Sequence, residues 1–213
     1  MRRHQLVFVR KTAWDALLKS RDDLAGEALV CNWVGNGWPL IVRRRLPSES
    51  DGLSLGLPLP PAVGKRRIAV RLHYEDIAST RPLPELTEVL GSAPVEWRPF
   101  LRELEDIART YAVHAGVFGS LGWQWLTGLN YLGSCSDVDI AWTLPPPERV
   151  GHLLEDLAEL DSRSPVRLDG ELVRADGAGV NWRELRAGGT ELALKTASDV
   201  ILYSRVAFLG AAA

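Results

Sequence analysis

The pattern of apolar and polar positions divides the chain into a weakly periodic first part and a strongly periodic second part. In the first part, short apolar runs alternate with Gly and Pro, which favours strands and turns around one amphipathic helix. Gly35-Asn36-Gly37 is typical of a hairpin turn. The predicted elements are strands at 6–9, 29–33, 39–44 and 66–72, helices at 12–24 and 84–90, and a loop at 52–64.

The second part begins with the clearest helical pattern of the chain. Between residues 95 and 111, Trp97, Leu101 and Leu104 fall on one helical face. Pro145-Pro146-Pro147 opens a second helix that runs to about residue 160, because proline fits the first turn of a helix. The other predicted elements are strands at 115–118, 138–142, 166–173, 180–185 and 192–195, and a closing helix at 198–209. This order of elements predicts an α+β fold class.

Prolines and Gly91 interrupt the periodic patterns between residues 79 and 94, and we place a domain boundary there. We expect a small α/β domain at residues 1–90 and a second domain at 91–213, with a mixed sheet flanked by helices. No apolar run is long enough to cross a bilayer, and the N-terminal segment lacks the apolar stretch of a secretory signal. A cytoplasmic protein that does not bind membranes is therefore expected.

The charges are unevenly distributed along the chain. The net charge of -2 argues against general nucleic-acid binding. Residues 1–90 carry 14 Lys and Arg against 10 Asp and Glu, whereas the remainder carries 11 against 17. This split suits a polyanionic ligand, with Lys65, Arg66 and Arg67 as its predicted cationic contacts; the alternative is a solvated strand end. Cys31 and Cys135 fit no metal or redox spacing, which favours a reduced chain.

The strongest chemical signal is a pair of acids on a predicted strand. Asp137 and Asp139 are two residues apart, so their side chains point to the same face of the strand. Adjacent carboxylates repel each other, and a divalent cation removes this penalty. Oxygen ligands favour Mg²⁺, which often bridges to substrate phosphates. Gly119-Ser120, after the preceding strand, can offer N–H groups and a hydroxyl to a phosphate. Together these features indicate nucleotidyl transfer.

These motifs carry a family resemblance. Gly119-Ser120 followed by Asp137-x-Asp139 resembles the nucleotidyltransferase superfamily of the polymerase-beta type. Longer strings resemble the malonate decarboxylase holo-acyl-carrier-protein synthases, also called phosphoribosyl-dephospho-CoA transferases. The connection from Ser120 to Asp137 is longer than the general superfamily pattern, which suits a family-specific insertion. The longer strings are His4-Gln5-Leu6-Val7, Gly56-Leu57-Pro58-Leu59-Pro60, Gly64-Lys65-Arg66-Arg67, Val117-Phe118-Gly119-Ser120, Trp123-Gln124, Leu126-Thr127-Gly128-Leu129, Tyr131-Leu132, Ser136-Asp137-Val138-Asp139, Leu168-Asp169-Gly170-Glu171 and Trp182-Arg183-Glu184-Leu185.

The resemblance implies a definite reaction and a nucleotidyltransferase-like domain at residues 91–213. The enzyme would join the phosphoribosyl end of triphosphoribosyl-dephospho-CoA to a serine of the malonate decarboxylase acyl-carrier subunit, and pyrophosphate would leave. Asp137 and Asp139 would hold two Mg²⁺ ions, and Gly119 and Ser120 would hold the triphosphate. The alternatives are a nucleotidyltransferase acting on another small molecule or RNA, and a non-catalytic adaptor that binds an acyl-carrier domain.

Members of this superfamily usually have a third carboxylate on a later strand. Asp169 and Glu171 both qualify, and we prefer Asp169 as a metal ligand and as the base that takes the serine proton. Lys195 is a candidate for neutralising the leaving pyrophosphate, with a strand-end lysine as the alternative. Trp123 and Gln124 are candidates for substrate binding, since an indole can stack on adenine; packing in the core is the alternative.

Overall fold

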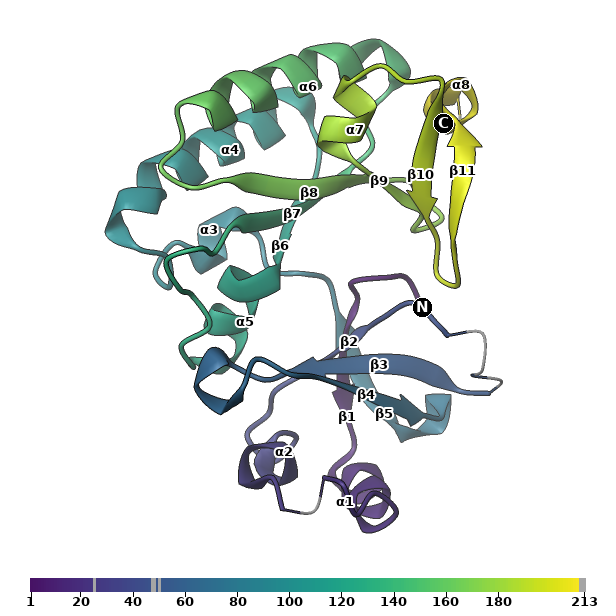
Figure 1. Ribbon diagram of the computed structural model, residues 1–213. Helices are drawn as coiled ribbons and strands as arrows, with labels where there is room; N and C mark the ends of the chain where they lie inside the picture. The colour runs from purple at the N-terminus through teal and green to yellow at the C-terminus, as the bar shows by residue number, and fades with distance from the viewer. Residues whose placement is uncertain (25, 47–48, 50, 211–213) are drawn as a thin grey trace. The chain divides into compact units, whose positions relative to one another are not determined.

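The computed structural model describes residues 1–24, 26–46, 49 and 51–210. The chain forms two compact units, Met1–Pro82 and Leu83–Ala213, and each combines helices with a sheet, which confirms the α+β class (Figure 1). The division falls after Pro82 instead of after residue 90. The reason is that Leu86 and Val89 are fully buried in the core of the second unit. No helix in the described part of the chain is long and apolar enough to span a membrane.

The first unit is built on a five-stranded sheet with the strand order β4-β3-β2-β1-β5. Each described pairing in this sheet is antiparallel. Trp14 of α1 and Val30 of α2 are fully buried, and the Trp14 indole N–H donates to the Val30 carbonyl at 3.1 Å. The elements are β1 (Leu6–Val9), α1 (Lys11–Lys19), α2 (Ala28–Asn32), β2 (Leu40–Val42), β3 (Leu53–Pro58), η1 (Pro61–Val63), β4 (Arg67–Leu72), η2 (Tyr74–Asp76) and β5 (Ile77–Arg81).

Several predictions for the first unit are wrong. The predicted strand at 29–33 is helix α2, because Val30 and Trp33 lie three residues apart and are buried together. The predicted loop at 52–64 contains strand β3, whose alternating leucines are buried against β4. The turn at residues 35–37 follows a helix, so it does not close a hairpin. The helix predicted at 12–24 ends at Lys19, and β5 was not predicted.

The second unit contains a six-stranded sheet with the strand order β11-β10-β9-β8-β7-β6. Strands β7 and β8 are parallel and their described neighbours are antiparallel, so the predicted mixed sheet is confirmed. Helices α4 and α6 lie over one face of it (Figure 1). The elements are α3 (Leu86–Val89), η3 (Val95–Trp97), α4 (Arg98–Tyr111), β6 (Ala115–Phe118), α5 (Gly119–Thr127), β7 (Val138–Thr143), α6 (Pro147–Ser162), β8 (Leu168–Val173), β9 (Gly179–Asn181), α7 (Trp182–Arg186), β10 (Glu191–Lys195), β11 (Val200–Ser204) and α8 (Arg205–Gly210).

Two predictions near the C-terminus are wrong in part. The strand predicted at 180–185 is the short strand β9 followed by helix α7, because Asn181 caps the helix by accepting the N–H of Arg183 at 2.9 Å. The helix predicted at 198–209 is strand β11 followed by the short helix α8. A turn in which the Thr196 N–H donates to the Asp199 carbonyl at 2.8 Å returns the chain to pair with β10.

The Glu49 carboxylate accepts several hydrogen bonds in the first unit. They lower its pKa, so the stability of this unit should depend on pH. The carboxylate oxygens accept hydrogen bonds from Arg43, from the Leu46 N–H and from the Ser54 hydroxyl. The hydrogen bonds from Arg43, above all, lower the pKa of Glu49 to about 2 from its ordinary value of 4.5. Glu49→Gln should therefore lower the free energy of unfolding at pH 7 by about 1–3 kcal/mol, measured by urea denaturation.

The sign of the pH effect follows from the direction of the shift. Because the pKa of Glu49 is lower in the folded chain, the stabilisation is fully present above about pH 4.5 and is lost as the pH falls toward 2. The difference in the free energy of unfolding between wild type and Glu49→Gln should become smaller as the pH falls over that range. Glu75→Gln, at an exposed position of the same unit, is the matched control. An equal effect of the two substitutions at pH 7 would contradict this account.

Candidate active site

Three carboxylates meet at one edge of the sheet in the second unit. Strands β7 and β8 pair in parallel with Asp139 directly opposite Asp169, and Asp137 immediately precedes β7. One oxygen of each of Asp137, Asp139 and Asp169 lies within 4.8 Å of the others, and all three side chains are half-buried. The alternate residues Val138 and Ile140 are fully buried in the core below. The structure thus brings Asp169, from a distant segment of the sequence, next to the pair Asp137 and Asp139.

Gly119 lies against this cluster at the end of β6. Strand β6 pairs Phe118 with Asp139, so the chain turns into helix α5 directly beside the Asp139 carboxylate. Gly119 has a φ of 63°, and a Cβ at this position would lie 1.8 Å from Asp139 Oδ2. Only glycine has room here. The half-buried Ser120 follows in the first turn of α5, whose backbone N–H groups favour an anion.

Asp169 is oriented by a residue that the sequence analysis missed. Asn181 Nδ2 donates to Asp169 Oδ1 at 2.9 Å, while Asn181 Oδ1 caps helix α7. The N–H of Gly170 also donates to Asp169 Oδ1, at 2.8 Å. The sequence contained a signal for this helix, because an Asn followed three residues later by Glu184 is typical of a helix N-terminus. The sequence prediction instead assigns residues 180–185 to a strand, and so misses this helix.

The beginning of β8 is fixed by a second polar network. Asp161 Oδ1 accepts the N–H of Leu168 at 2.9 Å, and Arg183 Nη2 donates to the same carboxylate at 2.8 Å. Arg183 Nη2 also donates to the Leu168 carbonyl at 2.9 Å. The Arg183 guanidinium lies 4.4 Å from the centroid of the Trp182 ring. Both main-chain groups of Leu168 are therefore held next to Asp169.

Glu171, the other candidate for the third carboxylate, has a different environment. It is 5% exposed, and its Oε1 accepts a hydrogen bond from Lys195 Nζ at 2.7 Å. It is not among the three acids whose oxygens converge. Lys195 is a candidate for neutralising pyrophosphate, with a strand-end lysine as the alternative; in the structure its ammonium group donates to Glu171. A phosphate near Lys195 would therefore share this ammonium group with Glu171.

Trp123 and Gln124 lie in α5, where their contacts favour packing over the predicted binding of substrate. Trp123 is 6% exposed, which leaves little of the indole available for stacking on a base. Gln124 Nε2 donates to the Ser92 carbonyl at 2.8 Å, and its Oε1 accepts the N–H groups of Tyr131 and Leu132 at 3.1 and 3.2 Å. Through these hydrogen bonds Gln124 anchors the loop that leads from α5 to β7. Burial of Tyr131 in this loop raises the pKa of its hydroxyl.

The cationic residues Lys65, Arg66 and Arg67 are exposed in the first unit, at the turn that leads into β4. Lys65 has a φ of 49°, and Arg66 forms an ion pair with Glu27. Within residues 1–82 the sequence has 14 Lys and Arg against 8 Asp and Glu, whereas residues 83–213 have 11 against 19. The first unit is therefore basic and the second acidic.

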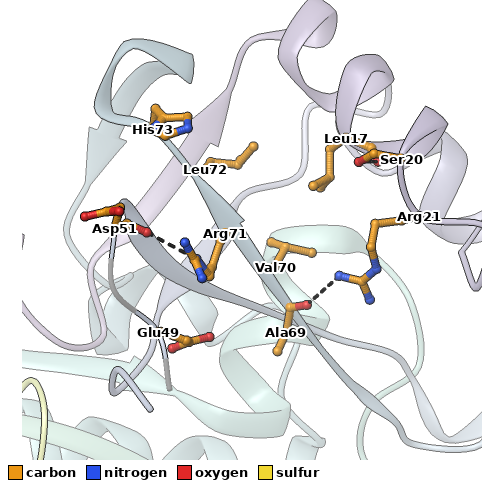
Figure 2. Close-up of a pocket in the computed structure, with 10 residues that line it drawn as sticks. All are labelled: Leu17, Ser20, Arg21, Glu49, Asp51, Ala69, Val70, Arg71, Leu72 and His73. Carbon is orange, nitrogen blue, oxygen red and sulfur yellow. Dashed lines mark hydrogen bonds between the residues drawn. The ribbon is translucent and has the colours of Figure 1, made fainter. Parts of the chain in front are cut away.

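The pocket whose lining residues are drawn in Figure 2 lies within the first unit and has a volume of about 380 Å³. Its cations are bonded to main-chain oxygens: Arg21 donates to the Ala69 carbonyl at 3.3 Å and Arg71 donates to the Asp51 carbonyl at 3.1 Å. Among the described residues that line this pocket, none was predicted as a site residue. The cluster of three acids found among the described residues lies in the second unit.

Comparisons with known proteins identify both units. Residues 2–82 match the family model of the phosphoribosyl-dephospho-CoA transferase MdcG N-terminal domain, and residues 85–206 match that of the MdcG C-terminal domain. These limits agree closely with the structural division after Pro82. No solved structure matches the chain.

Curated relatives with the name phosphoribosyl-dephospho-CoA transferase cover almost the whole chain. The protein of Bradyrhizobium diazoefficiens is 43% identical over 210 residues, which are 99% of this chain and 93% of the relative. That of Xanthomonas euvesicatoria pv. vesicatoria is 37% identical over 208 residues, 96% of this chain and 95% of the relative. That of Pseudomonas aeruginosa is 28% identical over 187 residues, 82% of each. The chain belongs to the phosphoribosyl-dephospho-CoA transferase family and is a transferase.

Proposed function

We propose that this chain transfers the phosphoribosyl-dephospho-CoA group from triphosphoribosyl-dephospho-CoA to a serine of the malonate decarboxylase acyl-carrier subunit. The serine Oγ forms a bond to the α-phosphorus, the bond from that phosphorus to the bridging oxygen breaks, and pyrophosphate leaves. The name of the relatives supplies the transferred group. Within the molecule, the convergence of Asp137, Asp139 and Asp169 beside the start of α5 carries the proposal.

The residues at the site fit a metal ion. Three carboxylates with oxygens within 4.8 Å of one another are the oxygen-only donor set that Mg²⁺ prefers. Without a cation they repel one another. We propose that Asp137, Asp139 and Asp169 hold two Mg²⁺ ions. Bound Mg²⁺ would neutralise charge on the oxygens of the transferred phosphoryl group and of the leaving pyrophosphate.

Residues of the chain bind the triphosphate and accept the proton in the proposed reaction. The N–H groups at the start of α5 and the Ser120 hydroxyl bind the triphosphate. Asp169 accepts the proton of the serine hydroxyl, because a carboxylate can act as a general base when it is held within hydrogen-bonding reach. Asn181 keeps the Asp169 carboxylate in one orientation through the hydrogen bond of 2.9 Å. Arg183 and Asp161 also help to position Asp169, because they fix the main chain of the preceding residue, Leu168.

Lys65, Arg66 and Arg67 are proposed to bind phosphates of the donor or acidic groups of the carrier subunit. Their exposure leaves them accessible, and the basic character of residues 1–82 supports attraction of an anion. Exposed charges act over about 10 Å at ordinary ionic strength, so this attraction should depend on salt.

Both paired acids should be required for transfer. Asp137→Ala and Asp139→Ala each remove a carboxylate from the cluster, and each should abolish the mass increase of the apo carrier subunit in an intact-mass assay with Mg²⁺ and triphosphoribosyl-dephospho-CoA. Pyrophosphate release should be lost in parallel. Asp22→Ala, at an exposed position of the first unit, is the control and should transfer normally. Near-normal turnover of a folded Asp137 or Asp139 variant at saturating Mg²⁺ would exclude the metal role.

The same assay tests the proposed acceptor. Transfer to a small molecule or RNA, with an unmodified carrier subunit, would favour a different nucleotidyltransferase. Binding of the carrier subunit without any transfer by the wild-type chain would favour a non-catalytic adaptor.

Asn181→Ser should separate the two functions of this side chain. Serine still caps a helix, but its hydroxyl is too short to reach Asp169. The variant should therefore melt close to wild type while kcat falls, or the Mg²⁺ requirement rises, by about tenfold or more. Asn181→Leu removes both contacts and should also lower the melting temperature. Asn36→Ser, in an exposed turn, is the control. Unchanged kcat and Mg²⁺ dependence in Asn181→Ser would show that Asn181 does not position Asp169.

The triple variant Lys65→Gln, Arg66→Gln and Arg67→Gln should weaken binding of the donor or of the carrier subunit. The salt dependence of that affinity should become flatter, because screened charges have been removed. Isothermal titration at several ionic strengths measures both effects.

The control for this prediction replaces three exposed cations elsewhere, Lys19, Arg102 and Arg109, with Gln. It gives the same change in net charge. If the two triple variants behave alike, the effect comes from net charge, and residues 65–67 form an ordinary solvated strand end.

A further inference from the structure

A cavity of about 680 Å³ adjoins the carboxylate cluster at Asp137, and its described lining lies within the second unit. One wall is the loop at residues 132–136, a second is the segment at 165–167 before β8, and a third is the turn at 94–97 before α4. Asp137 belongs both to the lining and to the cluster of three acids. A molecule in the cavity would therefore lie next to the proposed reaction centre.

The wall at residues 132–136 is held in place by hydrogen bonds. Gln124 Oε1 accepts the N–H of Leu132 at 3.2 Å, and the Ser136 hydroxyl oxygen accepts the N–H of Gly133 at 2.9 Å. The wall at residues 165–167 is held at Arg167, whose carbonyl accepts the N–H of Val138 at 2.9 Å. These bonds shape the cavity before any ligand binds, which lowers the entropic cost of binding.

The lining selects the chemical class of the ligand. Apart from Asp137, which belongs to the proposed metal site, the charged side chains of the described lining are the carboxylate of Glu96 and the guanidinium of Arg167, so the rest of the lining has no net positive charge to attract a polyphosphate. Apolar surface comes from Leu132, Pro94 and Pro165, whereas Trp97 is 8% exposed and offers little of its ring. The volume is typical of small-molecule pockets, whereas a docked protein domain would need a much wider surface. An uncharged, partly apolar group with hydrogen-bonding atoms fits these features.

We propose that this cavity binds the adenine nucleoside of the dephospho-CoA group, an inference that rests on the proposed function. In triphosphoribosyl-dephospho-CoA the adenosine carries the triphosphoribosyl arm, so a single ribose ring separates the nucleoside from the reacting phosphorus. The pantetheine chain begins only beyond a diphosphate. With the nucleoside beside Asp137, the triphosphate can extend along Asp139 toward Gly119 and Ser120. Glu96 offers an acceptor for the exocyclic amine of adenine.

The two cysteines of the chain provide a direct test. Cys135 is an exposed residue of the cavity lining, whereas Cys31 is a half-buried residue of α2 in the first unit. The rate of alkylation by iodoacetamide can be followed at both thiols by peptide mass spectrometry, with Cys31 as the internal reference. Saturating dephospho-CoA or AMP should slow alkylation of Cys135 by about tenfold or more, since a bound nucleoside excludes the reagent. The rate at Cys31 should not change, and 4′-phosphopantetheine should protect neither thiol.

A variant that fills the cavity tests the same inference through kinetics. Ser134→Trp should raise the KM for triphosphoribosyl-dephospho-CoA by about tenfold or more, with a much smaller change in kcat. The residue is exposed, so the fold should tolerate the change. Ser79→Trp, at an exposed position of β5 in the first unit, is the matched control and should leave KM unchanged.

The outcomes separate this inference from the proposed function. Protection of Cys135 by AMP without any transfer to the carrier subunit would support the nucleoside site and contradict the proposed reaction. Normal transfer with an unprotected Cys135 and an unchanged KM in Ser134→Trp would overturn the nucleoside site and leave the reaction standing. Protection by 4′-phosphopantetheine or by the carrier subunit, but not by AMP, would also overturn it.

Discussion

The parallel pairing of β7 with β8 is the constraint on which the site depends. It sets Asp139 opposite Asp169 and brings three carboxylates within 4.8 Å of one another. Two ionised carboxylates at that distance repel by about 3 kcal/mol at an effective dielectric constant of 20. The register is nevertheless imposed from the other face of the same strands, where Val138, Ile140 and Leu168 are fully buried. Each contributes about 1.5–3 kcal/mol through burial, so the core can hold the three acids together against their repulsion.

Uncharged residues also determine where the carboxylates of the cluster lie. Gly119 leaves the space that the Asp139 carboxylate occupies, and Asn181 links the cap of α7 to the orientation of Asp169. Gln124 fixes the loop that forms one wall of the cavity beside Asp137. The site is therefore held by main-chain geometry and hydrogen bonds, and such a fixed arrangement suits the proposed transfer, because alignment supplies much of the rate of phosphoryl transfer.

The two units differ in their electrostatics as well as in their sheets. The first is antiparallel and basic, and its exposed cations at residues 65–67 remain accessible. The second is acidic and contains the converging carboxylates. The family models divide the chain at almost the same place as the structure does. A basic unit together with a unit that has converging carboxylates is consistent with the proposed polyanionic donor.

Local pattern alone was sufficient for the long or strongly alternating elements and for the acidic pair. The helices at 98–111 and 147–162, the strand at 115–118 and the same-face placement of Asp137 and Asp139 follow from periodicity, because such segments bury one continuous face. Short apolar segments were ambiguous, since a segment of five residues such as α2 fits both the repeat of a helix and the repeat of a strand. The choice of Asp169 over Glu171 as the third clustered acid, the contact of Asn181 and the burial of Trp123 were decided by strand register and packing. These depend on residues distant in the chain, which no local pattern contains.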